Sequence, residues 1–339
     1  MEFTDVVATV SSWLAEGHRA AVARPVAFAG FSSRRPGEIL AVSETGQRTG
    51  EVLGRSISDT LAGRLADLMK PDQPRGRLIR LPVSATAAAA AGLACGGTVT
   101  VALHDAAGLP GRFWSTVTAG RPVALASVTG TSGTLLGSLV VAQDGISGTL
   151  SDPALEEQAI ASAKALLAAG RTASSVIRTD ERTLVIDAIV PAVQLVVAGS
   201  GDLAVALSRQ ADLLGWHFMA FDDAKSATEA IGSIGPGDGI VVLSHDPAVD
   251  TPVLAAAVAS RAGYLGALGS RRTQTARHDR LVGLGVSEAA LATIHGPAGL
   301  DLGARTPEEI ALAICAELLA VRSDRTGMSL VGRGAPINS

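Results

Sequence analysis

The stretch of this chain most suited to chemistry is the glycine turn Gly199-Ser200-Gly201-Asp202-Leu203-Ala204, which has the G-x-G-x-x-A spacing. It follows the apolar run "QLVVA" and opens the amphipathic run "DLAVALSRQADLLG". Glycines in this context permit a tight turn and close approach of a ligand to the backbone, and a helix N-terminus favours phosphate. Asp222 and Asp223 end the next apolar run, where an acid commonly binds a ribose hydroxyl. The pattern predicts a crevice shaped for a mononucleotide or dinucleotide.

Two further motifs lie at the ends of predicted strands. In "GALGSRR", Ser270 opens a helix, and Arg271 and Arg272 offer forked donors suited to phosphate. The alternative is a capped helix with two solvated arginines. His245 follows "GIVVLS", at the edge where open α/β sheets bind ligands, and is either a reactive group or a hydrogen-bonded spacer.

The two cysteines are too few for a disulfide framework or a thiol-only zinc site, so we expect no metal site and a reducing, cytoplasmic location. Cys315 lies among Ile, Ala and Leu of a predicted helix, and we expect it to belong to the hydrophobic core. Cys95 precedes Gly96, Gly97 and a strand. It is either open to a ligand on a turn or a small buried hydrophobe.

Composition and motifs exclude several classes of protein. The net charge of −4, with 18% charged residues and few aromatics, provides no basic stripe for nucleic acid. The only tyrosine, Tyr264, has Leu268 four residues on, which rules out a Tyr-x-x-x-Lys dehydrogenase pair. Uncharged windows at residues 86–103 and 122–143 contain Ala, Gly, Ser and Thr in strand and turn patterns, so we expect no membrane span.

The elements that must position these residues fall into two patterns. In the first part of the chain, "RPVAFAG" from Arg24 aligns with "RPVALAS" from Arg121, and each copy continues through a polar loop and a second apolar strand to a turn at Gly46 or Gly145. This predicts an N-terminal α+β domain, residues 1–190, that contains a duplicated strand-loop-strand unit. The alternative is chance similarity between two Val/Ala-rich strands.

From Gln194 onward, short apolar runs alternate with helical ones. Continuous apolar strands are typical of a parallel sheet with helices on both faces. The fold class is therefore α/β, with a Rossmann-like C-terminal domain over residues 191–323 and a flexible tail over residues 324–339.

Several of these motifs, in this order, resemble the C-terminal domain of the XdhC/CoxI family, the xanthine dehydrogenase accessory proteins. They are "VVAGSGDLAVAL", "LSHDPAVDTPVL", "YLGALGSRR" and "IHGPAGLDLGARTPEEIALAICAEL". Upstream, "FSSRRPGEILAV" and "LACGGTVTV" are similar to two N-terminal segments of the family. Carried over by motif, Arg34, Arg35, Gly37 and Cys95 with its two glycines belong to the cofactor-binding site.

The resemblance implies a chaperone of the molybdenum cofactor, in its molybdopterin or dinucleotide form. Such a protein protects the cofactor while a cysteine desulfurase partner adds sulfur, then hands it to an apo molybdenum hydroxylase such as xanthine or CO dehydrogenase, and has no turnover of its own. Because the protein hands over a large ligand, we expect a homodimer. Two departures matter: Ser56 stands at a family cysteine and Asp202 at a family histidine. An NAD(P)-binding oxidoreductase and a nucleotide-sensing or scaffold module remain alternatives.

Overall fold

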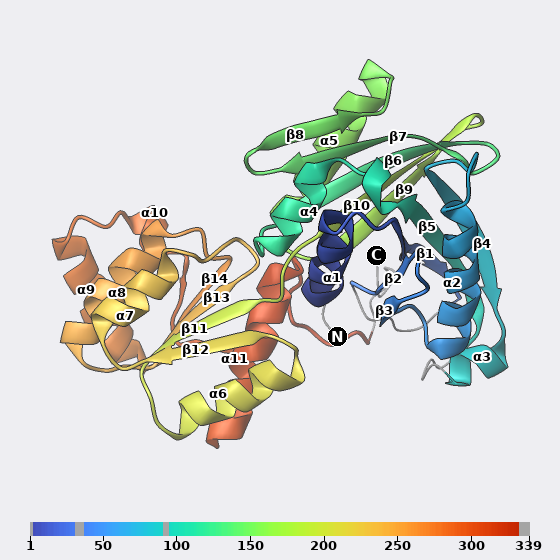
Figure 1. Cartoon of the computed structure of the whole chain (residues 1–339). Coiled ribbons are helices and arrows are strands. Elements are labelled where there is room, and N and C mark those ends of the chain that lie inside the picture. Colours follow the sequence, from blue (N-terminus) through green and yellow to red (C-terminus); the bar gives the residue numbers. More distant parts are fainter. Residues whose placement is uncertain (1–2, 31–36, 91–94, 332–339) are drawn as a thin grey trace. The chain divides into compact units, whose positions relative to one another are not determined.

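The computed structural model describes residues 3–30, 37–90 and 95–331 (Figure 1). Its contacts divide the chain into an N-terminal unit, Met1–Pro191, and a C-terminal unit, Ala192–Ser339. No helix among the described residues is long and apolar enough to cross a membrane.

The N-terminal unit contains two five-stranded antiparallel sheets. Sheet A has the order β3-β2-β1-β5-β4 and sheet B the order β8-β7-β6-β10-β9. The strands of sheet A are β1 (Ala20–Ala29), β2 (Ile39–Ser43), β3 (Arg48–Glu51), β4 (Gly76–Val83) and β5 (Gly97–Asp105). Those of sheet B are β6 (Val123–Gly130), β7 (Leu135–Ala142), β8 (Gly145–Thr149), β9 (Ala173–Arg178) and β10 (Arg182–Ile189).

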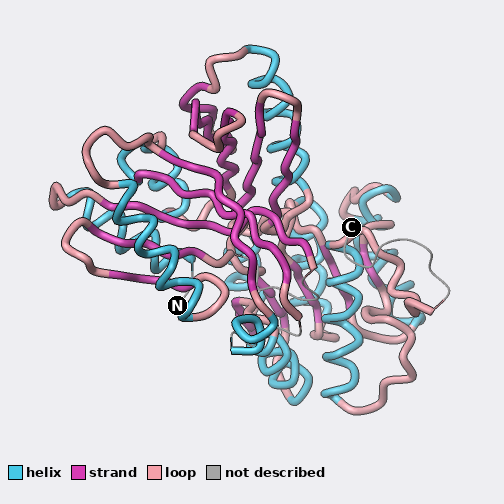
Figure 2. Tube along the Cα trace, turned by 90° about the vertical axis from the view of Figure 1, so that its right-hand side faces the viewer, coloured by secondary structure: helices cyan, strands magenta, loops and turns pink. Residues whose placement is uncertain are grey.

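The two sheets pack face to face, and each carries a helix on its outer face. Helix α2 (Arg55–Leu68) covers sheet A and helix α5 (Pro153–Ala168) covers sheet B. Between the sheets, core residues of both combine with helices α1 (Phe3–Ala15) and α4 (Gly111–Thr118). The remaining helix of the unit is α3 (Ala85–Ala90). Each helix buries an apolar face against its sheet, which accounts for the layered order seen in Figure 2.

The predicted duplication is present and extends further than the strand-loop-strand unit. In each copy three strands form a meander, a helix follows, and the fifth strand returns beside the first. The hairpin registers match as well, because Leu40 pairs with Gly50 and Leu139 pairs with Gly148. Both glycines have positive φ, and a Cβ on either would lie 2.1 or 2.3 Å from a backbone oxygen of the partner strand.

The alignment of the two Arg-Pro pairs, however, was wrong. Arg24 and Pro25 lie inside β1, at a register shift, whereas Arg121 and Pro122 precede β6. The registers make Ala23 equivalent to Ala126, because these residues pair with Leu40 and Leu139. The connection between β1 and β2 is longer than that between β6 and β7, so the two segments could be aligned in a shifted register.

The C-terminal unit is built on a parallel sheet, sheet C, of order β12-β11-β13-β14-β15. Its strands are β11 (Gln194–Ala198), β12 (His217–Phe221), β13 (Gly239–Val242), β14 (Tyr264–Ala267) and β15 (Ile294–His295). Its helices are α6 (Asp202–Leu213), α7 (Ala224–Ile231), α8 (Pro247–Ala259), α9 (Arg271–Gly283), α10 (Glu288–Leu291) and α11 (Pro307–Arg322).

Helices cover both faces of sheet C, as predicted. Leu195 and Val197 point to the face covered by α6 and α11, while Val196 and Ala198 point to the face covered by α7 and α8. Because alternate residues of a strand face opposite sides, a strand buried on both sides must be apolar throughout. The run "QLVVA" meets that requirement.

Candidate functional site

The glycine turn joins β11 to α6. Gly199 has a φ of 121°, and a Cβ there would lie 3.0 Å from the backbone nitrogen of Ser244. Gly201, with a φ of 96°, precedes α6 and has open space around it. Asp202 is exposed in the first turn of α6 and Ala204 is buried below it. The first glycine is therefore required by the close approach of the neighbouring loop, and the second by its backbone conformation.

This turn lies where the strand order of sheet C reverses, because β11 is flanked by β12 on one side and β13 on the other. Ligands of open α/β sheets bind at such a switch point, outside the carboxyl ends of the strands. The loop after β13 contributes His245, which is exposed, and Asp246, which caps α8 through the Ala248 amide at 2.9 Å.

The two aspartates after β12 have different surroundings. Asp223 caps α7 and accepts a hydrogen bond of 2.9 Å from the Ser226 amide, which lowers the pKa of its carboxyl group. Asp222 is exposed. Of the two acids expected at a ribose, Asp223 is thus already engaged as the N-cap of α7.

Helix α9 has a basic first turn. Ser270 caps it by accepting a hydrogen bond from the Thr273 amide at 3.3 Å. Arg271 and Arg272 are exposed, and neither forms an ion pair with any residue that the structure describes. Two uncompensated guanidinium groups beside a helix N-terminus favour an anion.

A polar network that the sequence did not predict connects β14, β15 and α11. The Tyr264 hydroxyl donates to Glu317 Oε2 at 2.6 Å, the Gly299 amide donates to the same oxygen at 2.7 Å, and His295 Nδ1 lies 3.1 Å from Oε1. Burial alone would raise the pKa of Glu317, but these hydrogen bonds outweigh it and the pKa is lowered. Glu317 therefore anchors the loop that leads from β15 to α11.

In the N-terminal unit, Cys95 lies just before β5. It is exposed, and its thiol donates to the Gly30 carbonyl at 2.8 Å. A Cβ on Gly96 would lie 2.6 Å from the Val83 carbonyl oxygen, so the neighbouring backbone requires glycine there. Gly97 begins β5 and Gly37 has a φ of 82°. Arg34 and Arg35 lie outside the described residues.

The two cysteines differ in accessibility. Cys315 is 1% exposed in α11, and burial raises the pKa of its thiol to about 12. The prediction that it belongs to the core is confirmed. Ser56, at the position of a family cysteine, is exposed in the first turn of α2. Cys95 is consequently the thiol that a ligand can reach.

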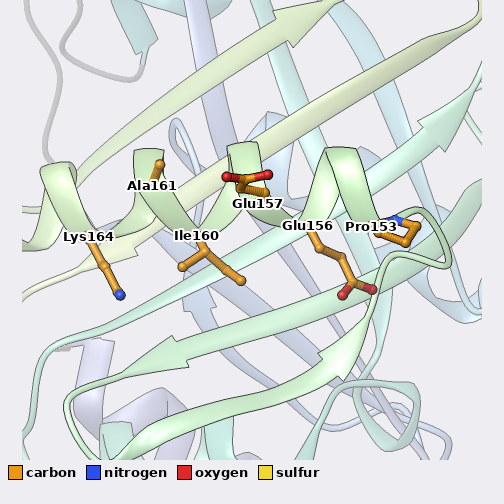
Figure 3. A pocket seen from close by; sticks show the side chains of 6 residues that line it. All are labelled: Pro153, Glu156, Glu157, Ile160, Ala161 and Lys164. Atoms are coloured by element: carbon orange, nitrogen blue, oxygen red, sulfur yellow. The ribbon is translucent and has the colours of Figure 1, made fainter.

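A surface groove lies elsewhere, along α5 (Figure 3). It is lined by Pro153, Glu156, Glu157, Ile160, Ala161 and Lys164. The Glu156 carboxylate in it accepts hydrogen bonds from the Thr149 hydroxyl and the Leu150 amide. The groove contains none of the predicted site residues. Across the described residues there is no cluster of three or more His, Cys, Asp or Glu that could hold a metal ion.

Two protein families known from other sequences match this chain. The family model described as "XdhC Rossmann domain" matches residues 195–318, and that described as "XdhC and CoxI family" matches residues 116–180. The molybdenum cofactor insertion chaperone PaoD of Escherichia coli is 35% identical over 132 residues, which are 39% of this chain and 41% of PaoD. The uncharacterized protein YqeB of the same organism is 27% identical over 154 residues, which are 40% of this chain and 28% of YqeB.

These matches span less than half of the length of either curated relative. A crystal structure described as a xanthine dehydrogenase from Bacillus halodurans covers 97% of this chain and 98% of its own, with a TM-score of 0.62 and 19% identity. At that identity the likeness shows the fold. Fold and matched segments define a protein with an XdhC-type Rossmann domain. Both family models and PaoD relate the chain to the XdhC/CoxI family, which confirms the resemblance seen in its motifs.

Proposed function

We propose that this protein binds the molybdenum cofactor, protects it and passes it to an apo molybdenum hydroxylase. The observation that carries the proposal is the match of 132 residues of this chain, at 35% identity, to PaoD, a molybdenum cofactor insertion chaperone. Cofactor is cargo in this role, so the protein needs binding groups and no turnover of its own.

The donor groups fit such a cargo. A pyranopterin carries phosphate, and its dinucleotide form adds a nucleotide. Arg271 and Arg272 supply free positive charge, and the glycine turn that starts at Gly199 leaves the backbone open to a ligand. Asp202 disfavours phosphate at the start of α6, so α9 is the better place for it.

Cys95 is proposed for the metal end of the cofactor, because a thiolate is a soft ligand suited to molybdenum and sulfur. Ser56 cannot act as a second thiol, so any sulfuration by a cysteine desulfurase partner relies on Cys95 alone. A homodimer, an apo-hydroxylase client and the desulfurase are part of the proposal.

The glycine turn also suits NAD(P), which is the second candidate. It would require hydride transfer, for which the Tyr-x-x-x-Lys pair is missing from the sequence. A nucleotide-sensing or scaffold role would need binding without handover.

A handover assay tests the proposal. The protein is loaded with cofactor without oxygen, freed of excess cofactor by gel filtration and mixed with a purified apo molybdenum hydroxylase. We expect hydroxylase activity to appear, and to fall with Cys95→Ala. The matched control Cys315→Ala, which removes the buried thiol, should still give full hydroxylase activity. Failure of cofactor to elute with the wild-type protein would contradict the proposal.

A further inference from the structure

One buried arginine connects two helices and two loops at the carboxyl edge of sheet C. Arg277 lies on α9 and its residue surface is 2% exposed. Its Nε donates to Asp250 Oδ2 on α8 at 2.8 Å. Its Nη2 donates to the Ser244 carbonyl at 2.6 Å, and its Nη1 donates to the Leu268 carbonyl.

Only arginine suits this position. A guanidinium presents its donors in a rigid planar fork, which lets one side chain bind a carboxylate and two carbonyls at once. Its charge is balanced by Asp250, which is 0% exposed and is approached by Arg280 Nη2 at 3.4 Å. A buried cation without such a partner would be strongly destabilising.

The two carbonyls belong to the loops that border the crevice. Ser244 follows β13 and packs against Gly199 of the glycine turn, while Leu268 follows β14 and leads to Ser270 at the start of α9. Gly269 has a φ of 131°, and a Cβ there would lie 3.4 Å from Arg277 Nη1. The arginine therefore fills the space directly below the second loop.

Holding these carbonyls also sets the direction of two amides. In a trans peptide, the C=O of one residue and the N–H of the next point in opposite directions. The N–H groups of His245 and Gly269 must then point away from the buried guanidinium, on the side where His245 and Ser270 are exposed. Neither N–H forms a hydrogen bond with any residue that the structure describes.

We propose that Arg277 is a positioning residue of the ligand site. By holding the Ser244 and Leu268 carbonyls, it presents the His245 and Gly269 amides as a pair of fixed donors for the phosphate of the bound cofactor. This inference rests on the proposed function for the identity of the ligand, whereas the ordering of the two loops by Arg277 is independent of it.

The test compares Arg277→Lys and Arg277→Ala with Arg280→Ala. The control removes an arginine from the same Asp250 but touches neither loop carbonyl. Lysine retains a cation beside Asp250, which favours folding, yet it cannot make all three bonds. The first readout is the backbone order parameter of residues 244–246 and 268–270 from NMR relaxation. The second is the dissociation constant for molybdopterin cofactor.

We expect the order parameters of both loops to fall from about 0.85 toward 0.6 in the Arg277 variants and to stay high in Arg280→Ala. Cofactor binding should weaken about tenfold in the Arg277 variants and less than about twofold in the control. Loops that stay ordered in Arg277→Lys, or an equal loss of affinity in Arg280→Ala, would overturn the inference. If the wild-type protein binds no cofactor, the proposed function fails, and the relaxation data still decide whether Arg277 orders the loops.

Discussion

The two copies within the N-terminal unit share strand order, hairpin register and helix placement, but they differ at one end of the sheets. In the first copy, residues 30–38 join β1 to β2 and residues 84–96 join β4 to β5. In the second, residues 131–134 and 179–181 make the same connections. The packing of sheet and helix fixes the framework of both copies, whereas the connections between strands can lengthen without disturbing it. All the N-terminal residues proposed for the cofactor lie in or beside the two longer connections.

Two buried contacts between the sheets join equivalent positions of the two copies. The registers make Arg24 equivalent to Ser127, and His104 equivalent to Asp187. Arg24 Nε binds Asp187 Oδ2 at 2.5 Å, and His104 Nε2 lies 3.0 Å from Ser127 Oγ. The same two positions thus meet twice across the sheets, once as an ion pair and once as a neutral pair. Variants at these positions, at the hairpin glycines and at Cys95 test how far the two copies are equivalent.

The largest effect is expected from the ion pair. Arg24→Met should lower the free energy of unfolding by about 3–5 kcal/mol, because among the described residues it leaves the buried Asp187 carboxylate with the Ser174 hydroxyl as its one hydrogen-bond partner. Calorimetry of the full chain measures the change. The exposed pair of Arg48 and Asp59 is the control, and Arg48→Ala should cost less than about 1 kcal/mol. Equal losses in the two variants would show that the buried pair has no special weight.

The neutral pair should instead make stability depend on pH. Burial lowers the pKa of His104 from 6.5 to about 4. The unfolded chain therefore binds more protons than the folded chain between these values, so stability is lost as the pH falls from 6.5 to 4. The loss amounts to about 3 kcal/mol. Urea unfolding at several pH values should show this dependence in the wild-type protein, with a smaller one in His104→Gln; identical profiles would contradict it.

The third effect tests the equivalence of the two hairpins. Gly50→Ala and Gly148→Ala should each cost about 1–3 kcal/mol, because both positions combine positive φ with a nearby strand carbonyl. Gly46→Ala, which has positive φ but open space, should cost less than either. Thermal unfolding of the three variants provides the comparison. A large difference between Gly50→Ala and Gly148→Ala would mean that the copies are not equivalent there.

The smallest effect on stability is expected at the end where the copies differ. Cys95→Ala should change the free energy of unfolding by less than about 0.5 kcal/mol, because the side chain is exposed. In the native protein, a thiol reagent should modify Cys95 quickly and Cys315 slowly, since the latter is buried. Mass spectrometry of the labelled peptides identifies the site. Rapid labelling of Cys315 would contradict the structure.

Periodicity and turn residues predicted much of the fold. The helix and strand alternation after Gln194 and the capping box at Thr306 are both present, because such signals act over a few residues. The duplication was found, but its register was not, because two Val/Ala-rich strands offer many similar alignments. Local sequence patterns do not specify which residues of neighbouring strands pair with one another.

The candidate site was predicted in part. The glycine turn showed in the sequence because backbone conformation demands glycine at Gly199. Arg277 did not, because an arginine in the polar run "RRTQTARHDR" is typical of a solvated helix face. Its burial depends on Asp250 and on two loop carbonyls that only the tertiary fold brings together.

In the proposed function, this protein binds molybdenum cofactor. Isothermal titration of the reduced wild-type protein, without oxygen, tests it most directly. The titrants are the cofactor in its nucleotide-free and dinucleotide forms, with NAD and NADPH as comparators. Saturable binding of cofactor that is tighter than binding of either nicotinamide nucleotide is the expected result. Tight binding of NAD or NADPH with no response to cofactor would contradict the account and favour an oxidoreductase.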